Sequence, residues 1–287
     1  MSRRNSHKHK GIVGAVLALP DGILTLCCFA VPLVVIVLYS FWKIDLTTFT
    51  VTTDWNLGNY GDIFKSIYLQ ALLRSLLITI ATVTGCLLLG LPIAYFIASC
   101  KGKLQLLMIG AIVIPFWTSF VVRTYAWLEL LGAHGVITQA LVHMHLVTDG
   151  TDLRYSTTAV IIGMVYSYLP MMILPVYSTF EQLDQSLLEA AADLGKTPSQ
   201  AFFQIVIPSC GEGIVAGSLL VAIPALGEYT IPAILGGSKT LMIGNVIASE
   251  FQTTGNYPRG AALSSILMLA VMLILIAKQV VQWRKTQ

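Results

Sequence analysis

Long apolar runs separated by short polar stretches dominate the sequence. Six of them are long enough to cross a hydrocarbon core of roughly 30 Å: residues 11–41, 72–98, 104–131, 157–180, 213–235 and 261–283. Transmembrane β-strands need only about ten residues and alternate polar with apolar positions, which these runs do not. The pattern therefore predicts an all-α polytopic membrane protein with six transmembrane helices.

The first run contains Pro20 and Asp21, which we expect to break it. Its spanning part is then residues 22–41, so the chain divides into a basic N-terminal segment, residues 1–21, and a transmembrane domain, residues 22–287. Basic residues before a short apolar stretch also resemble a signal peptide. We expect a retained helix, because the apolar run resumes directly after Asp21 and no cleavage site is evident.

Composition and charge agree with a membrane protein. Charged residues make up 11% of the chain, against about a quarter in soluble proteins, and hydrophobic residues make up 56%. Lys and Arg gather on one side of the predicted spans, at Arg3, Arg4, Lys8, Lys10, Lys101, Lys103, Lys196, Lys278, Arg284 and Lys285. The other side has Lys43, Lys65, Arg154, Lys239 and Arg259. Positive charge favours the cytoplasmic side, so both termini are predicted there, and the net charge of +3 does not indicate nucleic-acid binding.

Catalytic and metal-binding patterns are missing from the sequence. The five cysteines lie in or beside apolar runs, and His134, His143 and His145 lack the spacing and partners of a metal site. No glycine-rich phosphate loop or nucleophile–base pair is present. We therefore predict neither an enzyme nor a bound cofactor or metal.

The polar stretches between the runs predict short additional elements. Residues 55–60 are rich in turn formers and should lead into a short interfacial helix. Residues 241–251 have helical spacing and suit a re-entrant or surface-lying helix, with residues 256–258 as its stop.

Residues 181–208 form an unusually long loop between the fourth and fifth runs, and they predict two short helices. Asp184 or Ser186 can cap the first helix, and Gly195 suits the left-handed position after its end. Thr197 can cap the second helix, with Pro198 at its first position. The first helix carries small and apolar residues on one side and carboxylates on another, namely Leu187, Ala190, Ala191 and Leu194 against Glu189 and Asp193.

The same loop carries a family motif. Glu189-Ala190-Ala191, three residues, Gly195, nine residues and then residues 205–208 resemble the EAA signature of ABC-importer permeases, which has Leu where this chain has Ile207. The resemblance implies a type I ABC-importer permease fold, in which the loop inserts a cytoplasmic coupling helix into a groove of a separate ATPase. It assigns ATPase coupling to Glu189, Ala190, Ala191, Asp193 and Gly195, and it leaves ATP and Mg²⁺ to that partner.

Further stretches narrow the resemblance to one branch. Residues 114–119, 123–127, 224–232, 241–245 and 257–262 are similar to the spermidine/putrescine permeases, and the similarity runs from about Leu57 onward. It implies a bacterial inner-membrane subunit that works with a second homologous permease, ATPase subunits and a periplasmic polyamine-binding protein. Branches that carry ferric ion, phosphonates or opines share parts of the pattern and stay open. A non-transporting membrane scaffold also stays open, although the intact loop argues against it.

Two charged residues within the predicted spans, Arg123 and Glu228, are candidates for function, because charges inside a membrane are costly and usually functional or paired. Glu228 suits the path of a cationic solute, but it could equally pair with Arg123 or lie in the external headgroup layer. Trp117 lies close to Pro115 in the sequence, and Tyr229 directly follows Glu228. Both are aromatic, and aromatic faces attract alkylammonium groups. An interfacial aromatic belt explains such residues as well. We assign the translocation pathway to Glu228, Tyr229, Trp117 and Arg123.

Overall fold

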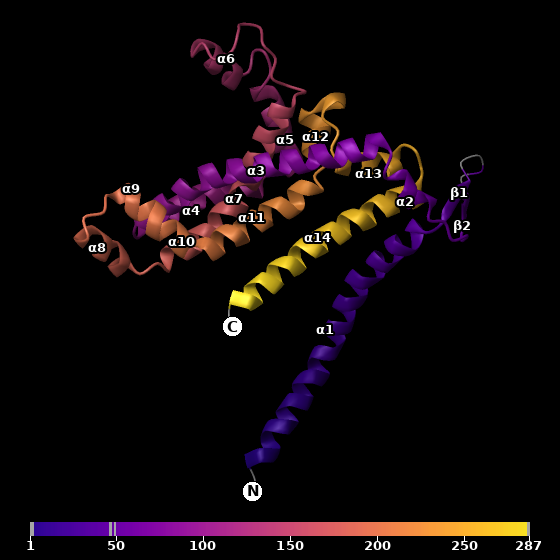
Figure 1. Cartoon of the computed structure of the whole chain (residues 1–287), viewed down its shortest axis with the longest axis horizontal. Helices are drawn as coiled ribbons and strands as arrows, with labels where there is room; N and C mark the ends of the chain where they lie inside the picture. The colour runs from indigo at the N-terminus through magenta and orange to yellow at the C-terminus, as the bar shows by residue number, and fades with distance from the viewer. Residues whose placement is uncertain (1–2, 46–47, 49, 286–287) are drawn as a thin grey trace. The chain divides into compact units, whose positions relative to one another are not determined.

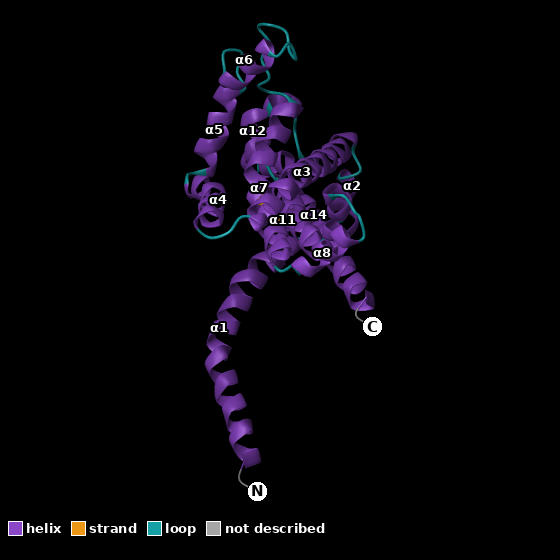
Figure 2. Ribbon diagram, turned by 90° about the vertical axis from the view of Figure 1, so that its left-hand side faces the viewer, coloured by secondary structure: helices purple, strands orange, loops and turns teal. Residues whose placement is uncertain are grey.

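The structure is a computed structural model that describes residues 3–45, 48 and 50–285, without the side chains of residues 3–19, 21, 185, 188, 239 and 281–285. Helices make up most of the described chain (Figure 2). The chain forms two compact units, one from residues 1–65 and 247–287 and the other from Ser66–Val246, with the boundary inside α13 (Ile243–Gln252). The basic side chains of residues 3–10 and 284–285 are not among the described ones. The cytoplasmic location of both termini therefore stays a prediction.

The larger unit is a bundle of long helices with several shorter helices (Figure 1). Its long helices are α3 (Ser66–Ser99), α7 (Thr157–Glu181) and α11 (Gly211–Leu226). Its shorter elements are α4 (Lys103–Val113), η1 (Ile114–Trp117), α5 (Phe120–Leu130), α6 (Val136–His143), α8 (Gln185–Asp193), α9 (Pro198–Ala201), the π-helical η2 (Phe202–Val206), α10 (Ile207–Ser209), α12 (Thr230–Leu235) and η3 (Gly237–Lys239).

Helix α7 is the centre of this unit, because α3 and α11 both pack against it. Glycines let the backbones approach closely, as is common between helices in membranes. A Cβ on Gly90 would lie 3.0 Å from Met172, and one on Gly217 would lie 2.9 Å from the same side chain. Met172 is completely buried at this crossing. Packing around α7 therefore holds the spans on which the functional residues lie.

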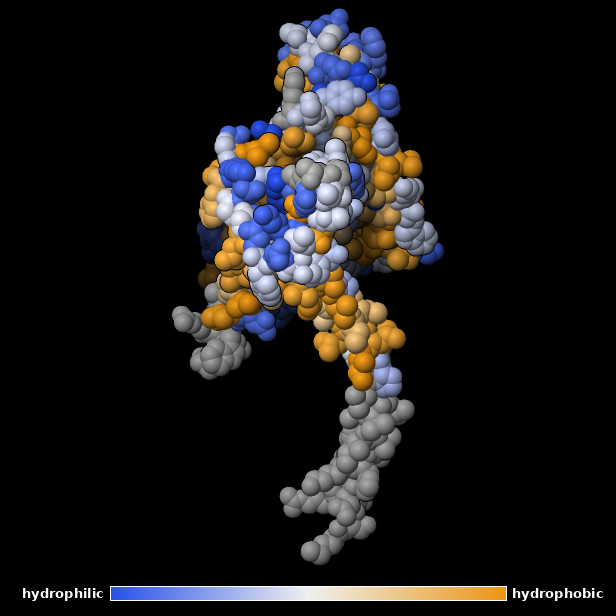
Figure 3. Space-filling model, turned by 90° about the vertical axis from the view of Figure 1, so that its right-hand side faces the viewer, coloured by the Kyte–Doolittle hydropathy of each residue, from blue (hydrophilic) through white to orange (hydrophobic). Residues whose placement is uncertain are grey.

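The smaller unit contains α1 (Arg3–Ser40), a hairpin of β1 (Lys43–Asp45) and β2 (Thr50–Thr52), α2 (Gly58–Asp62) and α14 (Tyr257–Lys285). The strands are antiparallel, with Ile44 opposite Val51. Helices α1 and α14 contact each other, and most described side chains of the α1 span are apolar and exposed (Figure 3). Lipid is the natural solvent for such a surface, since soluble monomers rarely expose large apolar patches.

Several predicted elements are confirmed. Helices α3, α7 and α14 cover the second, fourth and sixth runs, α2 follows the turn-rich residues 55–60, and α13 covers the helical spacing of residues 241–251. Among the described residues, four helices are long and apolar enough to cross a membrane, and the number rises to six if each bent pair is one span. The six-span prediction therefore depends on how two bent helix pairs are counted, Lys103–Trp117 with Phe120–Leu130 and Pro198–Ser209 with Gly211–Leu226.

Four expectations are wrong in detail. Helix α1 continues through Pro20, and proline is more frequent within membrane helices than within soluble ones. The third run bends by 97° between η1 and α5, where Pro115 removes a donor and Thr118 is extended. The fifth run ends at Leu226 and restarts as α12. Helix α13 already ends at Gln252, and Tyr257 and Pro258, expected to stop it, begin α14. The two-stranded hairpin was not predicted.

Candidate functional site

Two short helices joined at Gly195 form the segment between α7 and α10. The Asp184 side chain accepts a hydrogen bond from the Ser186 backbone at 2.9 Å, which caps α8 and lowers the pKa of Asp184. Gly195 has φ +76°, a conformation that residues with a Cβ seldom adopt. Thr197 and Gln200 form a capping box at α9, with Pro198 at its first position. The predicted helix pair, its caps and its glycine are thus confirmed.

The side chains of α8 divide between packing and exposure. Ala191 is only 2% exposed and belongs to the interior, whereas Glu189, Ala190 and Asp193 are exposed. Leu194 is 80% exposed at the end of the helix. The segment therefore offers carboxylates and an unpartnered leucine to whatever binds this end of the larger unit.

An aromatic chain connects this segment to the long helices. The Phe202 ring lies 5.0 Å from the Tyr95 ring of α3, and Tyr95 lies 5.8 Å from the Phe180 ring of α7, both edge-on. Phe180 is buried, and Val206 one turn after Phe202 is completely buried. Because packed interiors transmit displacement, a shift of α9 and η2 would press on the ends of α3 and α7.

Glu228 lies at the break between α11 and α12, and its carboxylate is fully engaged there. Oε1 of Glu228 accepts three hydrogen bonds, from the backbone N–H groups of Thr230 at 2.8 Å, Tyr229 at 3.1 Å and Ile231 at 3.3 Å. Oε2 accepts from the Tyr168 hydroxyl of α7 at 2.5 Å. The carboxylate thus caps α12 and ties it to the central helix. Sequence reasoning did not identify Tyr168 as its partner, and the residues give no local signal for that long-range pairing.

The same break is held from a second direction by the start of α13. Asn245 donates from Nδ2 to the Tyr229 carbonyl at 2.8 Å. A Cβ on Gly244 would lie 2.5 Å from the Gly227 carbonyl oxygen, so only glycine fits there. The Tyr229 side chain itself is half-exposed. Gly244 and Asn245 are positioning residues that the sequence pattern alone did not single out.

Trp117 and Arg123 lie on either side of the bend between η1 and α5. Trp117 is 85% exposed. The Arg123 guanidinium lies 4.3 Å from the centre of the Phe116 ring, which stacks on Tyr166 of α7. Within the described part of the chain, Nε and Nη1 of Arg123 are buried without a hydrogen-bond partner. No ion pair links Arg123 to Glu228 among the described residues. The four predicted pathway residues thus form two groups, one at the break between α11 and α12 and one at the bend between η1 and α5.

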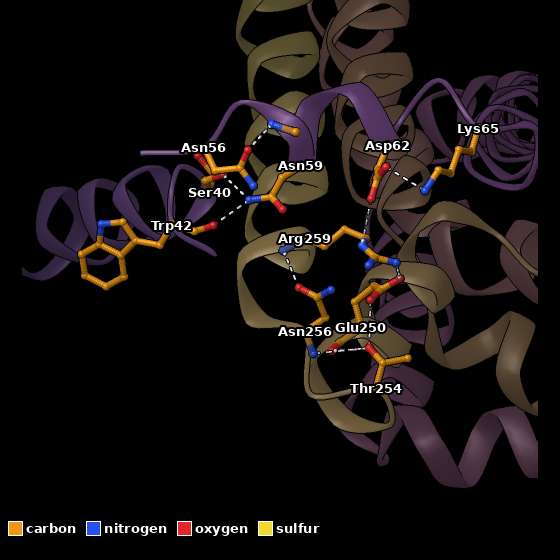
Figure 4. Close-up of polar contacts among 11 residues, drawn as sticks. Ser40, Trp42, Asn56, Asn59, Asp62, Lys65, Glu250, Thr254, Asn256 and Arg259 are labelled. Carbon is orange, nitrogen blue, oxygen red and sulfur yellow. Dashed lines mark hydrogen bonds and ion pairs between the residues drawn. The ribbon is translucent and has the colours of Figure 1, made fainter. Parts of the chain in front are cut away.

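A polar cluster orders the smaller unit (Figure 4). Arg259 of α14 lies 3.7 Å from Asp62 of α2 and 3.7 Å from Glu250 of α13. Lys65 lies 2.7 Å from Asp62, and this hydrogen bond is the largest cause that lowers the pKa of Asp62. Asn59 donates to the carbonyl of Ser40, the last residue of α1, and to that of Trp42, directly before β1. The cluster joins α1, α2 and α14.

Among the described residues, no group of three or more His, Cys, Asp or Glu side chains is arranged to hold a metal ion. His143, His145 and Asp149 do share a surface pocket beside α6. His145 has φ +56°, an unusual backbone conformation for a residue with a side chain.

Residues 20–283 match the family model described as "Binding-protein-dependent transport system inner membrane component". The chain is 36% identical over 284 residues to the spermidine/putrescine transport system permease protein PotB of Salmonella typhi, covering 99% of this chain and 96% of that protein. It is 41% identical over 218 residues to PotB of Haemophilus influenzae, 76% of each chain. A crystal structure of a bacterial alginate ABC transporter with its alginate-pentasaccharide-bound periplasmic protein has a TM-score of 0.72 at 15% identity, covering 100% of this chain and 99% of that one.

Proposed function

Because the chain belongs to the binding-protein-dependent transport system inner membrane components, we propose that it is the transmembrane permease subunit of an ATP-driven importer of polyamines such as spermidine and putrescine. The observation that carries this proposal is the similarity to spermidine/putrescine permeases along 99% of the chain. The chain itself is not an enzyme, and ATP and Mg²⁺ are bound by ATPase partners.

The proposed assembly places the chain in the bacterial inner membrane with both termini in the cytoplasm. It pairs with a second homologous permease and receives its solute from a periplasmic binding protein. The membrane lipid surrounds the apolar face of α1 and the other spans, as their exposed side chains require.

The segment of α8 and α9 is the proposed ATPase-docking element. The exposed Glu189, Ala190 and Asp193 would contact the ATPase, with the carboxylates facing basic groups, while Ala191 and Gly195 set the shape of the helix pair. The aromatic contacts of Phe202 supply a route to α3 and α7. Closure of the ATPase would then move the spans together.

The break between α11 and α12 and the bend between η1 and α5 are the proposed elements of the translocation pathway. Glu228 and Tyr229 interrupt the fifth run, and Trp117 and Arg123 flank the bend in the third. A carboxylate and exposed aromatic rings suit a polycation. Arg123 is the observation that favours a second candidate, an importer of an anionic solute such as a phosphonate, because its cationic side chain has buried nitrogens with no hydrogen-bond partner among the described residues.

The test is reconstitution of the permease with its partner permease, ATPase and binding protein in liposomes. Spermidine uptake should require ATP and the binding protein, whereas a secondary carrier would not need either. Calorimetry of the binding protein against polyamines and phosphonates separates the two solutes.

Glu189→Lys tests the docking assignment in the same assembly. We expect loss of ATPase co-purification and of uptake, because the reversed charge would face the basic groups of the ATPase. Glu212→Lys is the matched control, since Glu212 is also exposed but lies on α11, outside the helix pair. Normal assembly and uptake in the Glu189 variant would remove the assigned role.

A further inference from the structure

A polar pocket of about 270 Å³ lies in the larger unit where two long helices end. Its lining includes Tyr95 near the end of α3, Phe180 and Glu181 at the end of α7, Lys101 in the connection to α4, and Gln105 in the first turn of α4. In Figure 1 this region lies at the same end of the bundle as α8 and α9. Tyr95 and Phe180 also belong to the aromatic contacts described above, whereas Lys101, Gln105 and Glu181 have no part in the proposed docking contacts or pathway.

The pocket contains one positive and one negative side chain that do not neutralise each other. Within the described part of the chain, neither Lys101 nor Glu181 has an ion-pair partner within 4.0 Å. Glu181 accepts a long hydrogen bond of 3.4 Å from Gln105, and it also interacts with the hydroxyl of Tyr177, to which Gln105 donates at 2.8 Å. Both charged residues are exposed, so the pocket is open to a ligand from outside.

The helix ends add partial charges of the same sign as the neighbouring side chains, negative near Glu181 and positive near Lys101. Helices α3 and α7 end at Ser99 and Glu181, where free carbonyl groups attract cations. Helix α4 begins at Lys103, and its free N–H groups attract anions beside Lys101. A ligand with a cationic group near Glu181 and an anionic group near Lys101 would match both sets of charges.

We propose that this pocket binds the headgroup of a membrane phospholipid that carries a phosphate and a primary ammonium. The phosphate pairs with Lys101 and the start of α4, and the ammonium donates to Glu181 beside the Tyr95 and Phe180 rings. The lipid is the source because α3 and α7 are apolar helices of spanning length that end here, which places the pocket at headgroup level.

The position of the pocket gives the lipid a structural consequence. Tyr95 lines the pocket and also contacts Phe202 of η2, directly after α9. A headgroup against Tyr95 would therefore steady the segment that follows the helix pair of α8 and α9.

Native mass spectrometry of the purified full-length chain in detergent tests the proposal. Phosphatidylethanolamine, phosphatidylcholine and phosphatidylglycerol with identical acyl chains are added at equal concentration. A quaternary ammonium cannot donate to Glu181, and a glycerol headgroup has no cation, so we expect about tenfold more phosphatidylethanolamine adduct than either alternative. Glu181→Gln and Lys101→Gln should each reduce this preference to about twofold or less.

Glu212→Gln is the matched control, because Glu212 is exposed and does not line the pocket. It should keep the tenfold preference. Equal adducts of all three lipids on the wild type, or an unchanged preference in both pocket variants, would overturn the proposal. Glycerophosphoethanolamine without acyl chains is added separately, and its binding as strongly as the lipid would overturn the lipid as the source.

Discussion

The hydrogen bond from Tyr168 to Glu228 makes a quantitative prediction about the break between α11 and α12. The bond is 2.5 Å long and ends on a carboxylate that also receives three backbone N–H groups. Hydrogen bonds to charged groups contribute about 1.5–3 kcal/mol, and those measured within one helical membrane protein reach about 1.7 kcal/mol. Tyr168→Phe should therefore lower the free energy of unfolding by about 1.5 kcal/mol.

A double-mutant cycle isolates this contact. Tyr168→Phe, Glu228→Gln and the double variant are unfolded reversibly in mixed micelles, and the free energies of unfolding are compared. Gln keeps a carbonyl oxygen for the three backbone donors but loses the charge that Tyr168 meets. The coupling energy should be about 1 kcal/mol, whereas Glu228→Ala, which removes the helix cap as well, should cost about 3 kcal/mol.

Additive effects within about 0.3 kcal/mol would contradict the proposed contact, because independent sites behave in that way. Uptake measurements on the same variants separate structure from transport. If the charge of Glu228 only caps α12, Tyr168→Phe and Glu228→Gln lower stability alike and both transport spermidine normally when folded. If the charge lies on the pathway, only Glu228→Gln raises the KM of uptake, and normal uptake by this variant would remove Glu228 from the pathway.

Three further changes test local features. Gly195→Ala should cost about 1 kcal/mol, because φ is +76° there, while no atom lies within 4 Å of the added Cβ. Gly244→Ala should cost about 1–3 kcal/mol and reduce uptake, since the Cβ would meet the Gly227 carbonyl oxygen at 2.5 Å. Asp62 has a lowered pKa beside Lys65, so its stabilisation is present above the unfolded-state pKa of about 3.9 and is lost as pH falls through the folded-state pKa. The Tm difference between wild type and Asp62→Asn should therefore shrink below about pH 4.

Each of these changes has a control. Gly195→Asn should be tolerated better than Gly195→Ala, because Asn adopts the left-handed conformation more readily. Gly211→Ala should be nearly neutral, since Gly211 lies in open space. Asp54→Asn, at another exposed acidic residue of the smaller unit, should keep the same Tm difference from the wild type across this pH range. Equal losses in test and control variants would show that the local geometry does not determine the effect.

Local sequence chemistry predicted the α8–α9 segment almost completely. Asp184, Gly195, Thr197 and Pro198 act through hydrogen bonds and backbone preferences within a few residues, so their positions in the sequence suffice. The same motif correctly identified the family, and the apolar runs identified helices α3, α7 and α14. The outcome for α1 differed, because the cost of Pro20 depends on the surroundings of the helix rather than on proline alone.

The candidate pathway was predicted less completely for a physical reason. The sequence alone determined that charges and aromatic rings lie inside apolar runs, since this follows from residue type and run length. Only the tertiary structure decided that Glu228 meets Tyr168 and not Arg123, and that Asn245 holds Tyr229. Such pairings join residues up to 60 positions apart, and they depend on how helices cross around α7. Apolar periodicity selects the element, but side-chain partners are selected by packing.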